Sequence, residues 1–375
     1  MVSVVVLAYN VEDYILKCIE SIRKQTYSQL EIIVVDSDSK DNTGVICQEL
    51  ARIDKRIKYI CKKNEGPGAA RNMGFSLATY SYITFVDGDD WLELDAIENM
   101  INLAKTTEAD VVVGDMWYVY ANSDNEKLEK KYSKIRFEKN GVVSVTDNQK
   151  VSLINKSRTY TCGKLYRTNF LKEIDFRQGN YIYEDVAIVP YLVAKAKIVS
   201  YVNKPVYNYL KNRTKSLTNN EKKYSDMLIA LNELYVKFQK ENLLECYYNE
   251  LKRLMWGQIR FVCLKKTLIN KKDGQILYND LVNFYKEKFV GSFVPEECKI
   301  NIYNADFMKC IMDNILLYKE NISYIEDKQN IEKRMVVRVE NISREFKLDK
   351  IAESDLNDET NIWNWVDYLF EQIWC

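Results

Sequence analysis

The chain contains no histidine among its 375 residues. This absence removes the most common general base, the most common transition-metal ligand and every Ser-His or Cys-His nucleophile pair. Acid–base chemistry in this protein must therefore depend on carboxylates or, less readily, on lysine, tyrosine or cysteine.

The chain also lacks an excess of either charge and any long hydrophobic run. Lysine plus arginine and aspartate plus glutamate number 54 each, so charge gives no argument for a nucleic acid or an anionic membrane as partner. The N-terminal apolar run, residues 2–7, is far shorter than the roughly 20 residues that cross a bilayer, and no basic leader precedes it. We expect a cytoplasmic protein without a transmembrane segment, with peripheral contact at the inner face of the membrane left open.

Several sequence motifs are missing. The nine cysteines show no CxxC spacing of a zinc site, which favours reduced thiols. No GxGxxG follows the first predicted strand and no GxxxxGK[ST] occurs, which argues against dinucleotide-dependent oxidoreductases and P-loop proteins. A sugar-phosphate nucleotidyltransferase is disfavoured too, because its Gly-rich basic loop after the first strand is replaced here by Ala8-Tyr9-Asn10.

The segments that are present predict an α/β fold. With 47% hydrophobic residues, 12 glycines and 4 prolines, the composition is that of a packed globular protein. Buried-strand patterns occur at residues 2–7, 31–36, 56–61, 82–86 and 110–113. Helical patterns alternate with them at residues 11–22, 41–54, 68–79 and 93–105. This alternation predicts a doubly wound parallel sheet.

The character of the sequence changes near residue 220. Apolar residues then recur at helical spacing in segments 227–238, 251–268, 305–318 and 331–346. We therefore expect two domains: residues 1–220 with the α/β fold, and residues 221–375 as a mostly helical domain that serves acceptor binding, oligomerisation or packing.

Polar clusters follow the predicted strands, where ligands bind in open α/β sheets. These clusters are Ala8-Tyr9-Asn10, Asp36-Ser37-Asp38, Asn64-Glu65-Gly66 and Asp87-Gly88-Asp89-Asp90. Carboxylates on this rim would repel an anionic ligand unless a divalent cation lay between them. Asp87 and Asp89 offer the hard oxygen ligands that Mg²⁺ and Mn²⁺ prefer, and Gly88 lets a ligand approach the backbone.

The order of these motifs is specific. The chain contains VSVVVLAYNVEDYILKCIESIRKQTY, then EIIVVDSDSKDNT, EGPGAARNMGFSLA and YITFVDGDDW. These segments closely resemble the nucleotide-binding half of glycosyltransferase family 2, the inverting enzymes with the GT-A fold. Lys164-Leu165-Tyr166-Arg167 and Tyr183-Glu184-Asp185-Val186 resemble the acceptor-side motifs of its bacterial polysaccharide- and glycan-building members. The resemblance covers residues 1 to about 220.

The resemblance implies roles for particular residues. It assigns donor binding to Ala8, Tyr9, Asn10, Asp36, Ser37, Gly66, Arg71, Asn72, Asp87, Gly88 and Asp89. It implies that Asp89, with Asp87, holds Mn²⁺ or Mg²⁺, and that Asp185 is the catalytic base with Glu184 as its neighbour. Ala8 stands where the family usually has proline, and Ser37 where it has a second acid, so recognition of uridine is less secure.

The expected activity is therefore transfer of a hexose, such as galactose or glucose, from a UDP-sugar to a hydroxyl of a bacterial surface glycan, polysaccharide or glycoprotein glycan. The alternative is a non-catalytic subunit that binds another glycosyltransferase as a scaffold. Lys164 and Arg167 are candidates for contact with the acceptor or a phosphate, with solvated surface charge as the other interpretation. Trp91 is a candidate for a sugar-binding wall or for plain core.

Overall fold

The computed structural model describes residues 1–121, 128–133, 135, 142–144, 148–211, 225–269 and 271–289. The chain divides into two compact units, Met1–Leu254 and Met255–Trp374. The helices expected at 305–318 and 331–346 lie outside the described residues. The division falls inside a helix, later than the predicted boundary near 220, because the first helix after 220 packs on the α/β unit.

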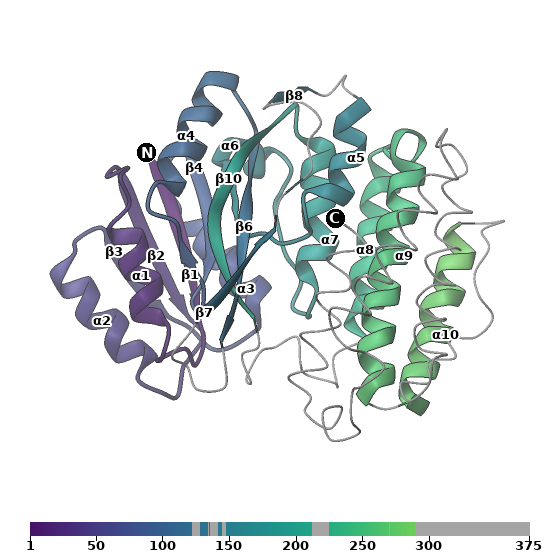
Figure 1. Ribbon diagram of the computed structural model, residues 1–375, viewed down its shortest axis with the longest axis horizontal. Helices are drawn as coiled ribbons and strands as arrows, with labels where there is room; N and C mark the ends of the chain where they lie inside the picture. Colours follow the sequence, from purple (N-terminus) through teal and green to yellow (C-terminus); the bar gives the residue numbers. More distant parts are fainter. Residues whose placement is uncertain are drawn as a thin grey trace. The chain divides into compact units, whose positions relative to one another are not determined.

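The strands of the first unit form one sheet (Figure 1). They are β1 (Val2–Ala8), β2 (Leu30–Asp36), β3 (Ile57–Cys61), β4 (Tyr82–Asp87), β5 (Trp91–Leu92), β6 (Val111–Ala121), β7 (Leu128–Ser133), β8 (Val142–Ser144), β9 (Lys164–Arg167) and β10 (Ile198–Lys211). The strand order is β3-β2-β1-β4-β9-β6-β10-β5, with β7 beside β6 and β8 beside β10.

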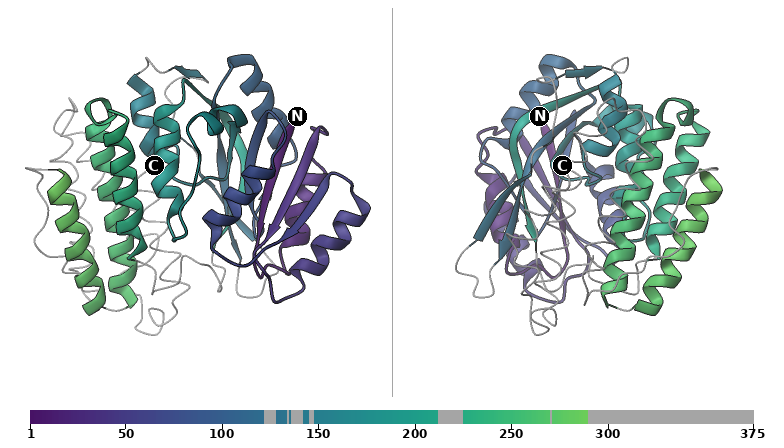
Figure 2. Two further views of the ribbon diagram at one scale, coloured as in Figure 1. Left: turned by 180° about the vertical axis from the view of Figure 1, so that it is seen from behind. Right: turned by 45° about the vertical axis from the view of Figure 1, so that its right-hand side comes forward.

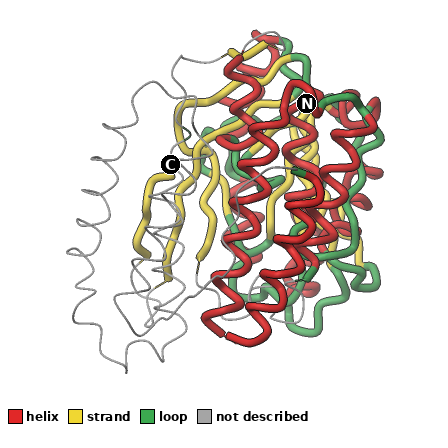
Figure 3. Tube along the Cα trace, turned by 90° about the vertical axis from the view of Figure 1, so that its right-hand side faces the viewer, coloured by secondary structure: helices red, strands yellow, loops and turns green. Residues whose placement is uncertain are grey.

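Helices lie against this sheet within the first unit, and the second unit is helical in its described part (Figures 2 and 3). They are α1 (Ile15–Arg23), α2 (Thr43–Ile53), α3 (Pro67–Leu77), α4 (Ala96–Thr107), α5 (Asn148–Lys156), α6 (Thr168–Glu173), α7 (Glu184–Lys195), α8 (Asp226–Lys240), α9 (Leu244–Ile269) and α10 (Lys271–Lys288). Among the described helices, none is long and apolar enough to cross a membrane.

The predicted parallel arrangement is confirmed for β1–β4, but the sheet as a whole is mixed. β1, β2, β3 and β4 pair in parallel, but β9 runs antiparallel to both β4 and β6. After β6 the chain returns as the antiparallel strand β7 instead of crossing over through a helix. The next strand to join the centre, β9, therefore enters in the reverse direction.

Alternation along β1 places helices on both faces of the sheet. Val4 and Val6 share a core cluster with residues of α1, α2 and α4. Val5 points to the opposite face, where a Cβ added to Gly74 of α3 would lie 2.2 Å from its Cγ1. The absence of a side chain at Gly74 lets α3 lie directly against the sheet, which brings its first turns to the carboxyl ends of the strands.

The last helix before the helical region is α7, which packs against α5 and α8 within the first unit. Most of its residues are buried. Of the two acids at its start, Glu184 is buried and Asp185 is half-buried. In the second unit, the described part of α9 and α10 has its own core, where the Trp256 and Tyr285 rings lie 5.1 Å apart.

Candidate active site

Three neighbouring strand ends form the rim of the site. The parallel register sets Ala8 of β1 beside Asp36 of β2, and Leu7 beside Asp87 of β4. The Gly88 N–H donates to the Leu7 carbonyl at 2.8 Å, and a Cβ at Gly88 would lie 2.6 Å from that oxygen. Glycine is therefore required where the chain turns from β4, and the predicted motifs meet on one edge.

The Asp36 carboxylate organises the first part of this rim. It is 2% exposed, and its Oδ1 accepts hydrogen bonds from the Ser39 N–H at 3.0 Å and the Ser39 hydroxyl at 2.6 Å. Its Oδ2 accepts from the Tyr59 hydroxyl at 2.7 Å. Ser37 follows on the same loop and donates its N–H to the Ala8 carbonyl at 2.8 Å.

Tyr9 and Asn10 lie on the outer side of the rim. Tyr9 is 39% exposed, a large surface for an aromatic ring beside a candidate ligand site. Asn10 has a left-handed backbone, with φ of 49°, and its Oδ1 accepts from the Lys40 N–H at 2.8 Å. The Asn10 side chain thus joins the loops after β1 and β2. Five of the residues expected to bind the donor lie on this joined edge: Ala8, Tyr9, Asn10, Asp36 and Ser37.

The start of α3 supplies the next group. Gly66, with φ of 94°, precedes the helix and Pro67 occupies its first turn, an arrangement that suits glycine and proline at these positions. Arg71 lies one turn further on and is 4% exposed. Gly68 packs against the backbone of the segment before α7, since a Cβ there would lie 2.1 Å from the Gly179 carbonyl oxygen.

Arg71 joins three carboxylates from two other elements. Its Nη2 donates to Asp87 Oδ1 at 3.0 Å. Its Nη1 donates to Glu184 and lies 3.3 Å from Asp185 Oδ1. Helix α3, strand β4 and helix α7 therefore converge on the buried guanidinium of Arg71. Arg71 and Glu184 are 113 residues apart in the sequence.

The cluster carries more negative than positive charge. Burial, followed by the charge of Asp185, raises the pKa of Glu184 from 4.5 to about 7. Burial also raises the pKa of Asp87, against the lowering effect of Arg71. A buried carboxylate is costly unless paired, and even with Glu184 protonated one guanidinium faces the two carboxylates of Asp87 and Asp185. The site therefore favours an additional cation.

Two sets of residues are candidates for holding that cation. Ligand atoms of Asp87, Asp90 and Cys162 lie within 4.8 Å of one another. Asp90, however, already accepts hydrogen bonds from the Tyr207 hydroxyl and the Leu210 N–H, both at 2.7 Å. Burial raises the pKa of the Cys162 thiol well above its usual range, which disfavours the thiolate that binds metal.

Asp89 is a better partner for Asp87. It is half-buried and lies on the same turn as Asp87, whereas Asp90 is 2% exposed. Mg²⁺ and Mn²⁺ beside a substrate phosphate usually take only one or two protein carboxylates. The residues therefore fit a divalent ion held by Asp87 and Asp89, with Asp90 fixing the backbone of β10.

Asp185, the expected base, lies at the start of α7 and its side chain is 19% exposed. Its Oδ1 accepts from the Thr161 hydroxyl, and its Oδ2 from the Thr161 N–H at 3.2 Å. Gln178 Nε2 lies 3.3 Å from Oδ1. Thr161 and Gln178 were not foreseen from the sequence, since neither belongs to a motif with a chemical signature.

The three remaining candidate residues contact other groups of the protein. Lys164 is buried and donates its ammonium to the Tyr160 carbonyl at 2.6 Å, so it is not a solvated surface charge. Arg167 donates to Asp110 at 2.8 Å through Nε. Trp91 is 9% exposed and packs with Val119 and Leu210, which supports the core interpretation.

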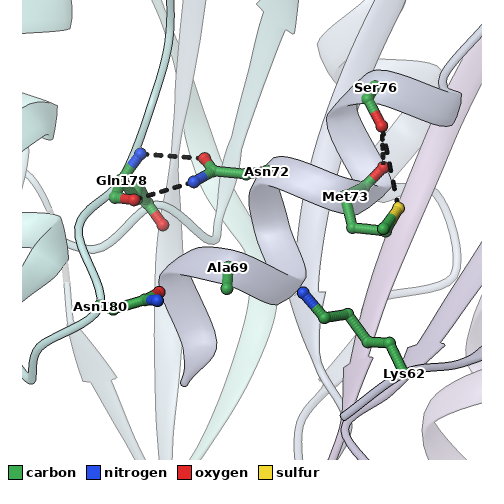
Figure 4. A pocket seen from close by; sticks show the side chains of 7 residues that line it. All are labelled: Lys62, Ala69, Asn72, Met73, Ser76, Gln178 and Asn180. Carbon is green, nitrogen blue, oxygen red and sulfur yellow. Dashed lines mark hydrogen bonds between the residues drawn. The ribbon is translucent and has the colours of Figure 1, made fainter. Parts of the chain in front are cut away.

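A groove of about 540 Å³ lies beside α3 (Figure 4). It is lined by Lys62, Ala69, Asn72, Met73, Ser76, Gln178 and Asn180. Of the residues expected to bind the donor, Asn72 lines this groove, whereas Asp87, Asp89 and Asp185 do not. The carboxylate site is defined by its hydrogen bonds and charge rather than by the groove.

Fold and site together define a class of protein. A sheet that begins with parallel strands β3-β2-β1-β4, carboxylates at the strand ends and an acid pair opening α7 are features of nucleotide-sugar-binding GT-A domains. The family model described as glycosyl transferase family 2 matches residues 3–175. The chain belongs to this family.

Known proteins agree with this assignment. Glycosyltransferase GlyG of Streptococcus pneumoniae serotype 4 is 31% identical over 270 residues, 67% of this chain and 89% of GlyG. Glycosyltransferase GlyA of the same organism is 34% identical over 217 residues, 56% of this chain but 30% of GlyA. The chain thus spans less than a third of GlyA.

A solved structure shows the same fold. S. aureus TarS 1-349 in complex with UDP-GlcNAc aligns with a TM-score of 0.50 at 19% sequence identity. The alignment covers 76% of this chain and 90% of that chain. At this identity the likeness establishes the GT-A fold and nothing finer.

Proposed function

We propose that this protein is an inverting glycosyltransferase that moves a hexose from a UDP-sugar to an acceptor hydroxyl on a growing bacterial surface glycan. The observation that carries the proposal is the position of Asp185. Its carboxylate shares Arg71 with Asp87 of the Asp87-Gly88-Asp89 turn, so an acid at the start of α7 and the strand-end rim belong to one site.

The chemistry follows from direct displacement. The acceptor oxygen forms a bond to the anomeric carbon while the bond from that carbon to the phosphate oxygen breaks, and the acceptor proton passes to Asp185. Nucleoside diphosphate leaves with the bonding electron pair. A single carboxylate base is enough for this inverting reaction, and in a chain without histidine a carboxylate is the readiest base.

A divalent cation fits the other half of this scheme. When bound, Mn²⁺ or Mg²⁺ supplies charge stabilisation for the departing diphosphate. Asp89 and Asp87 would hold it, while the first turn of α3, after Gly66, offers backbone N–H groups of the kind that bind phosphate. Arg71 cannot take this role freely, because it is occupied by three carboxylates.

Support for the donor and acceptor comes from relatives and the site. TarS has been crystallised with UDP-GlcNAc, which supports a UDP-sugar donor but leaves galactose, glucose and N-acetylglucosamine for experiment to separate.

The free thiols are in keeping with a cytoplasmic location. They are Cys18, Cys47, Cys61, Cys162 and Cys246. We further propose that residues 221–375 serve acceptor binding, oligomerisation or packing.

A donor panel tests the proposal. Purified protein is incubated with UDP- and GDP-sugars and Mn²⁺, with and without oligosaccharide or lipid-linked acceptors, and release of nucleoside diphosphate is measured. We expect turnover of one UDP-sugar that is lost with EDTA. Binding of a UDP-sugar without turnover under any acceptor would instead support the non-catalytic scaffold.

A further inference from the structure

Thr161 contacts both oxygens of the expected base. Its side chain is fully buried, its hydroxyl donates to Asp185 Oδ1, and its N–H donates to Oδ2 at 3.2 Å. An ionised carboxylate only accepts hydrogen bonds. Two donors from one residue therefore fix the rotation of the Asp185 carboxylate about its own axis.

Gln178 extends this arrangement to the guanidinium. Its Nε2 donates to the Thr161 hydroxyl oxygen at 2.8 Å and lies 3.3 Å from Asp185 Oδ1. Its Oε1 accepts from Arg71 Nη1 at 3.2 Å. The amide has one donor end and one acceptor end, and both are used: a carboxylate at this position could not donate, and an amine could not accept.

Asn72 holds Gln178 in register with α3. The Asn72 amide donates to the Gln178 carbonyl at 2.8 Å, and its Oδ1 accepts from the Gln178 N–H at 2.9 Å. Figure 4 shows the Asn72 side chain facing Gln178, with both hydrogen bonds to the Gln178 backbone drawn. Because Asn72 follows Arg71 directly, α3 places the guanidinium and the Gln178 backbone together.

We propose that Thr161 and Gln178 are positioning residues that orient the Asp185 carboxylate toward the acceptor hydroxyl. This inference rests on the proposed function, in which Asp185 is the base. The three side chains are named the Asp185 clamp: Thr161, Gln178 and Asp185. If Thr161 and Gln178 only filled space, any side chains of the same volume would serve. If they orient Asp185, the Thr161 hydroxyl and the Gln178 amide are themselves required.

Paired variants separate these two roles. Thr161→Val keeps the shape but removes the hydroxyl, and Thr161→Ser restores it. Gln178→Met keeps the length but removes the amide. Its matched control is Gln25→Met, since Gln25 is also a buried glutamine, 6% exposed, and hydrogen-bonds Glu93 and Ser21 away from the site.

We expect Thr161→Val and Gln178→Met to lower kcat by about tenfold to a hundredfold, the effect of a misplaced reacting group, with the donor KM unchanged. Thr161→Ser should recover most of the rate, and Gln25→Met should keep it. In an Asp185→Asn background, neither substitution should cost more, because groups that act as a unit are not additive. Unchanged kcat, or an equal further loss in that background, would overturn the proposal.

A stability measurement keeps this test independent of turnover. Melting temperatures are compared for Thr161→Val, Asp185→Ala and the double variant. We expect the loss of Tm in the double variant to be much smaller than the sum of the two single losses, because either change alone already breaks the clamp. Additive losses would overturn the clamp, whereas a wild type without turnover on any donor would overturn the proposed function and leave this cycle readable.

Discussion

Replacing Arg71 by methionine should destabilise the protein strongly. Methionine has a similar length but no charge, so Asp87, Glu184 and Asp185 would lose their shared cation. Arg71 is 4% exposed, and removing one partner of a buried ion pair typically costs about 3–5 kcal/mol. For a unit of this size, about 1 kcal/mol corresponds to about 2–4 °C in Tm, so we expect a fall of roughly 6–20 °C.

The matched control is Arg177→Met, the same substitution in an exposed ion pair. The side chains of Arg177 and Asp175 are 77% and 79% exposed, and such surface pairs contribute about 0–1 kcal/mol. Urea unfolding followed by circular dichroism measures both variants.

The pH dependence of the loss in Arg71→Met adds a second test. Uncompensated carboxylates repel each other only when ionised, so the loss should be larger at pH 8 than at pH 5, where protons neutralise part of the cluster. The reasoning would be refuted if Arg71→Met lost no more free energy of unfolding than Arg177→Met, or if its loss grew as the pH fell.

Four further substitutions test other parts of the account. The native state keeps the Glu184 proton up to about pH 7 while the unfolded chain releases it near 4.5, so this stability is full below pH 4.5 and is lost as the pH rises through 7. Glu184→Gln should flatten that slope in urea titrations, and an unchanged slope would contradict the assignment. Asp89→Ala should abolish the response of turnover to Mn²⁺, whereas Asp90→Ala should lower Tm by several degrees and by more than Asp89→Ala, because Asp90 satisfies buried donors; equal effects on Tm would count against this division. Gly68→Ala should lower the free energy of unfolding by about 1–3 kcal/mol through overpacking against Gly179. An unchanged Tm in thermal unfolding would disprove this.

The common edge of the polar motifs was predictable because these residues follow strands. Parallel strands with strong apolar patterns have one probable register, so Ala8, Asp36 and Asp87 could be expected at a common edge. The helical pattern at residues 68–79 predicted α3, whereas the roles of Arg71 and Asp185 came from the family resemblance.

The central part of the sheet was not predictable in the same way. β9 has four residues, too few for a periodic signal, and its antiparallel pairing with β4 and β6 depends on the return of the chain after β6. Strand alternation with helices therefore predicted the parallel pairing that β1–β4 have, but not the antiparallel strand β9.

The clamp around Asp185 depends on long-range contacts. Gln178 and Asn72 are separated by 106 residues, and Thr161 and Asp185 by 24. Threonine and glutamine are common in loops, so nothing in their local sequence distinguishes a buried hydrogen-bonding role from exposure. Their function follows only from the position that the fold gives them.

Comparing Asp185→Asn with Asp175→Asn most directly tests the central claim that Asp185 is the base of a glycosyltransferase. Both variants exchange a carboxylate for an amide, but the Asp175 side chain is 79% exposed and pairs only with surface Arg177 among the contacts described. With the preferred UDP-sugar and Mn²⁺, we expect Asp185→Asn to lower kcat by at least about a hundredfold while donor binding persists, and Asp175→Asn to match the wild type. Equal rates for the two variants would contradict the account.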